Sequence, residues 1–214
     1  LGSGSTTTIF IDLLGAKLLS GGLQGINAVP TSQATRQQAQ RLGIPLVSLA
    51  ENPQLDLVVD GADEVDPSLN MIKGLGKALL REKMVAVHAR RFLIIIDESK
   101  LVQRLGTRGP LPVEIVQFEW QSSIQWLISL GSRAALWCDD LGKPFVTDNG
   151  NYLVRCWFVD EKGSELLRDL DKDIDTLATA HRCRHSGERN VGTCVPTTEH
   201  VGMGGSCLGN CLLR

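Results

Sequence analysis

The sequence lacks the features that mark membrane proteins and nucleic-acid-binding proteins. Its 22 Lys and Arg residues nearly balance its 24 Asp and Glu residues, and the formal net charge of −2 gives no basic excess for binding nucleic acid. It contains no apolar run long enough to span a bilayer and no secretory signal peptide. We therefore expect a cytoplasmic protein, unless a targeting segment precedes Leu1, which is not an initiator Met.

Internal repeats, low-complexity blocks and Walker-type GKS/T loops are also absent from the sequence. Cysteine and histidine are concentrated near its end, but no Cys-x-x-Cys pair occurs there and the spacings fit no common zinc finger. A structural zinc site is therefore the less favoured interpretation, and a disulfide framework is less favoured still, because the rest of the sequence has an intracellular character. The residues concerned are Cys183, Cys194, Cys207, Cys211, His181, His185 and His200.

The last part of the chain, residues 181–214, lacks Ile, Ala and aromatic residues and shows neither helical nor strand periodicity. Its sudden excess of Cys, Arg, Gly and His resembles translation in a shifted reading frame. We therefore expect an atypical tail, non-cognate or disordered, that contributes no strand.

The first half of the chain has the alternation of strand and helix that builds a parallel sheet. A helix between the first two predicted strands begins at a Thr31 or Ser32 cap and ends before Gly43. The predicted strands are 25–29, 44–49, 55–59 and 92–96. The sequence therefore predicts an α/β protein with a main domain at 1–109, built on an open, mostly parallel, Rossmann-like sheet.

From about Pro110 the patterns become shorter and indicate a small α+β domain at 110–180. Helices are predicted at 122–130 and 165–177, and strands at 110–119, 134–137, 145–147 and 152–159. With 214 residues, 43% of them hydrophobic, the chain is large enough for a main domain and a smaller second one.

Acids, a lysine and glycines gather in one short stretch, residues 55–83. Asp60 ends a predicted strand, Asp63 lies in the loop after it, Lys73 begins a glycine turn, and Glu82 lies on the predicted helix that follows. A carboxylate that removes a C–H proton, a cation that opposes an enediolate oxygen and acceptors for hydroxyls are what proton transfer on a polyol requires. Taken singly, each residue is more often part of a surface loop or a solvated helix face.

A second candidate element is the Gly/Ser turn of residues 1–8, which opens onto a predicted helix with Ile9, Leu13 and Leu14 on one side. Such a turn presents backbone N–H groups and the positive end of the helix dipole to an anion. By itself it is more often a linker or a plain helix cap.

Several strings of this sequence, in their order along the chain, resemble the type A ribose-5-phosphate isomerases. They are GSGSTT at 2–7, PTSQAT at 30–35, DGADEVD at 60–66, the IKG-x-G turn from Ile72, ALLREK at 78–83, DESK at 97–100, PLPVEI at 110–115 and VTDNGN at 146–151. The resemblance covers about residues 1–153. It implies that ribose 5-phosphate and ribulose 5-phosphate are interconverted without a metal or organic cofactor. It also implies that the second domain is ferredoxin-like and that the protein is a homodimer.

The resemblance also implies a role for each matching residue. Glu82 is expected to be the base, with Asp60, Asp63 and Lys73 as the other catalytic residues. The expected substrate-binding residues are Ser3, Gly4, Ser5, Thr6, Gly61, Ala62, Gly74, Leu75, Gly76 and Lys100, of which Ser3 to Thr6 and Lys100 hold the phosphate.

The chain departs from the family pattern in three respects. The family turn is richer in glycine where this sequence has Leu75 and Lys77, and the family usually has an acid where it has Arg155. A helix and a central strand that precede the first turn in the family do not occur before Leu1 in this sequence.

Two other function classes fit parts of the same pattern. A non-catalytic sugar-phosphate-sensing effector domain of a transcription regulator shares the Gly/Thr turn and the DGA-type loop, but it needs no base at Glu82. A Mg²⁺-dependent phosphatase or kinase would use Asp60, Asp63 and Asp66, since carboxylates suit that ion. The isomerase is favoured because it explains Glu82 and Lys73 together with the acids.

Overall fold

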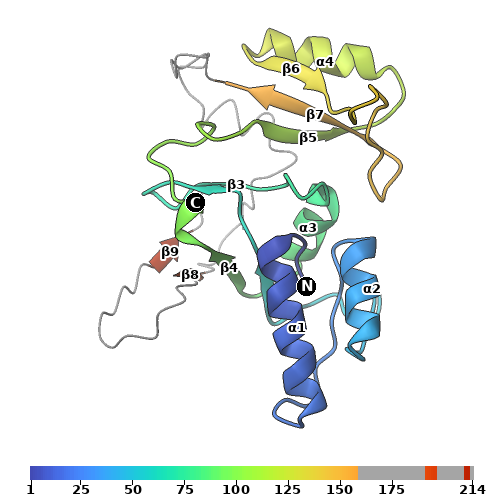
Figure 1. The fold of residues 1–214 in the computed structure, drawn as a ribbon, viewed down its shortest axis with the longest axis vertical. Coiled ribbons are helices and arrows are strands. Elements are labelled where there is room, and N and C mark those ends of the chain that lie inside the picture. Colours follow the sequence, from blue (N-terminus) through green and yellow to red (C-terminus); the bar gives the residue numbers. More distant parts are fainter. Residues whose placement is uncertain (159–190, 197–209, 213–214) are drawn as a thin grey trace. The chain divides into compact units, whose positions relative to one another are not determined.

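The computed structural model describes residues 1–158 and the backbone of residues 191–196 and 210–212 (Figure 1). The chain divides into two compact units that interleave along the sequence. The first unit comprises Leu1–Ala62, Arg81–Leu101 and Cys183–Arg214, and the second comprises Asp63–Leu80 and Val102–Arg182. The predicted domains are consecutive instead, and their boundaries stay a prediction.

The first unit contains a mostly parallel sheet, to which two of the four predicted strands contribute. Its strands are β1 (Val58–Asp60), β4 (Phe92–Ile96), β8 (Val191–Pro196) and β9 (Asn210–Leu212), in the order β1-β4-β8-β9. β4 pairs in parallel with both β1 and β8, and β9 is antiparallel to β8. Phe92, Ile94 and Ile96 are buried at alternate positions of β4, because successive side chains of a strand point to opposite faces of the sheet. The α/β class is therefore confirmed.

The prediction that residues 181–214 contribute no strand is wrong. β8 lies against β4 with Leu93 opposite Thr193 and Ile96 opposite Pro196. Val191, Thr193 and Val195 are β-branched residues with period two, which favours a strand, but Gly192 between them and Pro196 after them obscure the pattern. The hydrogen-bonding partners of this strand are the backbone groups of β4, which lie far away in the sequence. The local pattern around residue 193 therefore does not reveal them. The side chains of the tail cysteines and histidines lie outside the described residues.

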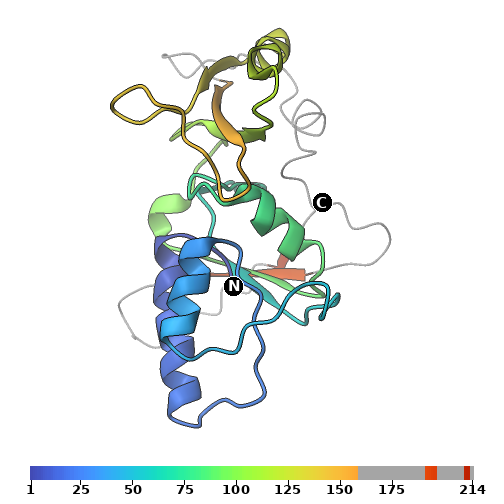
Figure 2. The same ribbon diagram turned by 90° about the vertical axis from the view of Figure 1, so that its right-hand side faces the viewer.

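Two helices of the first unit, α1 (Ser5–Leu19) and α2 (Gln33–Arg41), lie side by side (Figures 1 and 2). They enclose a small core to which Ile11, Ala39 and Ile44 contribute. α2 begins where the sequence predicts, because the Ser32 side chain accepts a hydrogen bond from the Thr35 backbone N–H at 3.0 Å.

The predicted strands at 25–29 and 44–49 are only partly formed. A single parallel bridge joins Ala28 to Leu46, with hydrogen bonds from Ala28 N to Pro45 O and from Val47 N to Ala28 O. The predicted parallel direction of the pairing is therefore confirmed, but the paired segment is shorter than the predicted strands.

The second unit is built on an antiparallel sheet of β5 (Leu111–Ile115), β7 (Tyr152–Trp157) and β6 (Arg133–Leu136), in the order β5-β7-β6. Helix α4 (Trp120–Ser129) covers one face of this sheet (Figures 1 and 2). Leu127 of α4 packs into a core with Val113 and Val154. The strand predicted at 145–147 is a single bridge from Val146 to Tyr152, and the helix predicted at 165–177 lies outside the described residues.

A short hairpin of β2 (Glu64–Val65) and β3 (Met71–Ile72) also belongs to the second unit, where the sequence predicts a loop. Glu64, only 2% exposed, fixes a neighbouring loop. Its carboxylate accepts hydrogen bonds from the backbone N–H groups of Gly106 at 2.6 Å, Arg108 at 2.9 Å and Gly109 at 3.0 Å. One buried anion therefore satisfies three backbone donors at once.

We expect Glu64→Gln to lower the free energy of unfolding by about 2–3 kcal/mol, because an amide removes the charge and offers only one acceptor oxygen. Urea denaturation measures the change. Glu119→Gln is the matched control, since Glu119 is exposed and its side chain makes no cap hydrogen bond. Equal midpoints for Glu64→Gln and wild type would contradict this role.

The remaining elements are α3 (Leu79–Ala86) and the 3₁₀ helix η1 (Glu98–Lys100). Among the described helices, none has the length and apolar character that a membrane crossing requires.

Candidate active site

Asp60 lies at the carboxyl end of β1, the edge at which open α/β sheets bind ligands. Its side chain is 1% exposed. One carboxylate oxygen, Oδ1, accepts hydrogen bonds from the backbone N–H of Gly61 at 2.8 Å and of Ser3 at 3.3 Å. The N-terminal turn and the DGA loop are each predicted to bind the substrate. They meet at this carboxylate.

The backbone of residues 1–3 is held on both sides. Gly2 N donates to Val59 O at 2.9 Å, and Leu1 N donates to Val29 O at 2.7 Å. A side chain at Gly2 has no room, because an added Cβ would lie 2.7 Å from the Asp60 Cα. This close approach explains why glycine precedes Ser3.

The Ser3 hydroxyl belongs to a cluster of hydroxyl groups at the start of α2. It lies 2.8 Å from Thr31 Oγ1, 2.8 Å from Ser32 Oγ and 3.2 Å from Thr35 Oγ1. Thr35 Oγ1 in turn donates to the Gly2 carbonyl at 3.0 Å. Ser3 therefore fixes the turn to α2, in addition to any contact with a ligand.

Gly4, Ser5 and Thr6 form the start of α1. Gly4 has a φ of 119°, and both Gly4 and Ser5 are exposed. The first intrahelical bond runs from Thr8 N to Gly4 O at 2.9 Å, so the backbone N–H groups that precede it point out of the helix end. This is the geometry that the predicted phosphate site requires.

Glu82 lies on α3 and is 4% exposed. The predicted helix is confirmed, but its buried side is different from the one that the apolar spacing suggests. Leu80, Met84 and Val87 are 36%, 50% and 44% exposed, whereas Val85 is buried with Glu82. A carboxylate thus takes a buried position on a helix that leaves apolar side chains exposed.

The second unit holds Asp63, Lys73 and the glycine turn. Leu75 N donates to Asp63 Oδ2 at 2.9 Å, and Asp63 N donates to Ile72 O at 2.8 Å, so Asp63 fixes both ends of the segment that carries Lys73. The turn itself closes through Lys77 N and Gly74 O, 2.9 Å apart, with Gly74 at a φ of 101°. Lys73 is half-buried at the start of this turn.

Comparison with known proteins decides the family. Residues 27–179 match the family model described as Ribose 5-phosphate isomerase A (phosphoriboisomerase A). The chain belongs to the ribose 5-phosphate isomerase A family. Ribose-5-phosphate isomerase A of Roseiflexus castenholzii is 51% identical over 158 residues, which cover 74% of this chain and 68% of the relative.

Two solved structures support membership of the isomerase A family. Ribose 5-phosphate isomerase from Plasmodium falciparum superposes with a TM-score of 0.76 at 34% identity, covering 91% of this chain and 85% of that one. A D-ribose-5-phosphate isomerase in complex with phospho-erythronic acid gives a TM-score of 0.73 at 40% identity, covering 82% of this chain and 75% of that one. The family resemblance predicted from the sequence is therefore confirmed.

For this member of the isomerase A family, the structure joins the predicted residues in two sets. Ser3, Asp60 and Gly61 meet in the first unit, and Asp63 meets Leu75 in the second. Lys100 is half-buried at the end of η1, just after β4 and Asp97, whose carboxylate accepts a hydrogen bond from Ser99 N at 2.8 Å. Hydrogen bonding from Ser99, through its side chain first and its backbone N–H second, holds the pKa of Asp97 below its usual value. The roles of the predicted site residues stay predictions.

The hydroxyl cluster is the part of the site that residue-by-residue reasoning missed. Thr31, Ser32 and Thr35 belong to the PTSQAT string, which signals the family, but their contact with Ser3 joins residues 28 to 32 positions apart. No local pattern predicts that contact.

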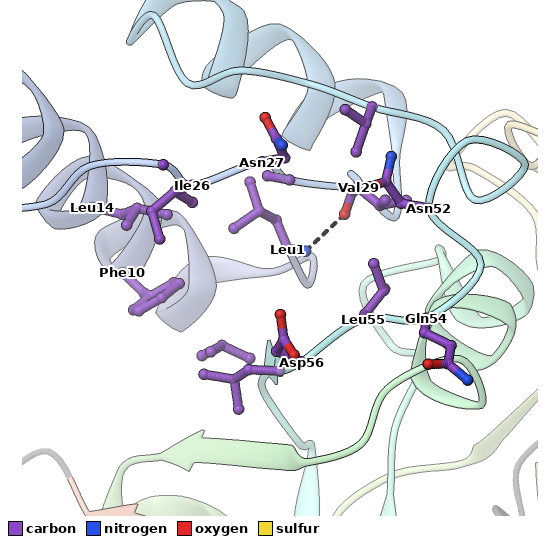
Figure 3. Close-up of a pocket in the computed structure, with 15 residues that line it drawn as sticks. Leu1, Phe10, Leu14, Ile26, Asn27, Val29, Asn52, Gln54, Leu55 and Asp56 are labelled. Carbon is purple, nitrogen blue, oxygen red and sulfur yellow. Dashed lines mark hydrogen bonds between the residues drawn. The ribbon is translucent and has the colours of Figure 1, made fainter.

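The first unit also contains a pocket of about 320 Å³ (Figure 3). Its lining is largely apolar, with Leu1, Phe10, Leu14, Ile26, Val29 and Leu55 among the residues that the figure labels. None of the predicted site residues lines it.

The carboxylates considered for a magnesium site accept hydrogen bonds from other residues of the protein. Asp66 accepts hydrogen bonds from Asn70 N at 2.9 Å and from Asn70 Nδ2 at 3.1 Å, which closes the β2–β3 hairpin. Within residues 1–158, no three His, Cys, Asp or Glu side chains are grouped so that they would hold a metal ion. The geometry thus gives no support to a carboxylate-metal centre in this part of the chain.

Proposed function

We propose that this protein is an aldose–ketose isomerase that interconverts D-ribose 5-phosphate and D-ribulose 5-phosphate through an enediolate. The observation that carries the proposal is the buried carboxylate of Glu82 on α3, in a chain of the isomerase A family. A sugar-phosphate sensor needs no such base, and the matched relatives are isomerases. The isomerase is therefore favoured over the sensor.

Glu82 carries the proton between C2 and C1 of the sugar. Packing on a helix holds the carboxylate in one place, which general-base catalysis requires. Lys73 opposes the negative charge that develops on the enediolate oxygen. Asp60 and Asp63 accept hydrogen bonds from the sugar hydroxyls and assist ring opening.

The phosphate is bound by the start of α1, with Ser3, Gly4, Ser5 and Thr6, and by Lys100. Backbone N–H groups at a helix start and a lysine are both suited to a phosphate dianion. Contacts at the phosphate orient the distant C1 and C2 atoms for proton transfer. The residues that complete the contact with the sugar are Gly61, Ala62, Gly74, Leu75 and Gly76.

Three further features belong to this proposal. The second unit corresponds to a ferredoxin-like α+β domain, and the first unit corresponds to a Rossmann-like main domain. The protein acts as a homodimer, and it is located in the cytoplasm.

We expect turnover to be unaffected by a chelator, because Lys73 supplies the positive charge that a metal would otherwise bring. The measurement is ribulose 5-phosphate formation from ribose 5-phosphate with and without EDTA. A loss of turnover in EDTA that Mg²⁺ restores would favour the carboxylate-metal alternative. The absence of any isomerisation by the folded protein would refute the proposed function.

A further inference from the structure

Lys77 has a backbone conformation that lysine rarely adopts. Its φ of 67° lies in the left-handed region, which favours glycine. The residue closes the turn of residues 74–77, since its N–H donates to the Gly74 carbonyl. That backbone hydrogen bond forms equally well with glycine at position 77, so it does not explain a lysine there.

The side chain of Lys77 lies on two aromatic rings. Its Nζ is 4.2 Å from the centre of the Phe145 ring and 5.1 Å from the centre of the Trp137 ring. Both distances are within the range of about 6 Å for cation–π attraction. Lys77 is half-buried, so water screens this attraction less than at an open surface.

The two rings form a fixed platform, because their backbones are tied to β7. Phe145 N donates to Trp137 O at 2.8 Å, and Trp137 N donates to Leu153 O at 2.7 Å. The guanidinium of Arg155, on the same strand as Leu153, lies 5.7 Å from the centre of the Trp137 ring. The platform of Trp137 and Phe145 is therefore hydrogen-bonded to the antiparallel sheet, whereas the turn 74–77 is a loop.

We propose that Lys77 is a positioning residue that tethers the glycine turn to this platform. The tether offsets the strain of the left-handed backbone and keeps Leu75 N on the Asp63 carboxylate, 2.9 Å away. Because Lys73 lies directly before the turn, the tether also fixes the cation assigned to the enediolate. The consequence for catalysis rests on the proposed function, whereas the tether itself does not.

Hydrogen exchange tests the tether without reference to activity. Lys77→Met keeps the length of the side chain and removes its charge, so the hydrogen-bonded amides of Leu75 and Lys77 should exchange about tenfold faster than in wild type. Lys77→Arg, which keeps the cation, should exchange as wild type does. Lys143→Met is the matched control, because Lys143 is an exposed lysine of the same unit. Wild-type exchange in Lys77→Met would overturn the proposal.

Steady-state kinetics test the positioning role. We expect kcat of Lys77→Met to fall about tenfold with KM little changed, because Lys73 acts on charge that exists only in the transition state. Lys77→Arg should restore kcat. Phe145→Leu should lower kcat in the wild type and have little further effect in Lys77→Met, and fully additive losses would refute the tether. A wild-type protein without isomerase activity would refute the proposed function and leave hydrogen exchange to decide on the tether.

Discussion

Glu82→Gln is expected to lower kcat by about a hundredfold or more, since removal of a general base typically costs at least that factor. The amide keeps the shape of the side chain in its buried position on α3 and loses the ability to take the proton. Binding of ribose 5-phosphate should survive, because the phosphate and hydroxyl contacts come from other residues. Steady-state kinetics and calorimetric binding of the sugar phosphate measure the two effects separately.

The matched control for this substitution is Glu98→Gln, which makes the same chemical change at an exposed position of the same unit. It should leave kcat unchanged. If Glu82→Gln retained more than about a tenth of wild-type turnover, Glu82 would not be the base.

Gly2→Ala is expected to lower Tm by roughly 5 °C, since overpacking of this kind typically costs about 1–3 kcal/mol. The added Cβ would lie 2.7 Å from the Asp60 Cα, so the turn or β1 must shift. The hydrogen bond from Ser3 N to the Asp60 carboxylate depends on the same approach. We therefore expect turnover to fall with Tm, by more than about tenfold, because small displacements in an active site are costly.

Gly22→Ala is the control for Gly2→Ala, because a Cβ there meets its nearest atoms at 3.5 Å, an ordinary contact. Differential scanning calorimetry and the isomerase assay should show wild-type values for it. A Gly2→Ala protein with wild-type Tm and turnover would mean that the turn does not pack on Asp60 in solution.

The parts of the fold that the sequence predicts are those set by local chemistry. Ser32 caps α2 because its side chain meets an N–H three residues on, and Phe92–Ile96 is apolar enough to be recognised as a buried strand. The β2–β3 hairpin was missed because each strand is two residues long, too short to show a period.

The sequence predicts which residues form the site but not the contacts between them. Asp60 and Glu82 are recognised from the family strings, and burial of both carboxylates is consistent with functional positions. The side of α3 that is buried contradicts its apolar spacing, because a polar residue takes a place that hydrophobicity alone would give to leucine. Tertiary packing overrides local pattern at such positions.

The strand that closes the parallel sheet comes from the far end of the chain, and this has a consequence for synthesis. β4 and β8 pair through Leu93 and Thr193, which lie far apart in the sequence, and the second unit is largely encoded between them. Closing so long a loop before the paired strands can stabilise each other makes this step slow. On the ribosome the second unit can therefore fold first, and one edge of β4 lacks its neighbour until residue 196 has left the exit tunnel. During that interval the unpaired strand is open to other chains, so a nascent chain of this protein should depend on chaperones more than a chain whose sheet is completed early.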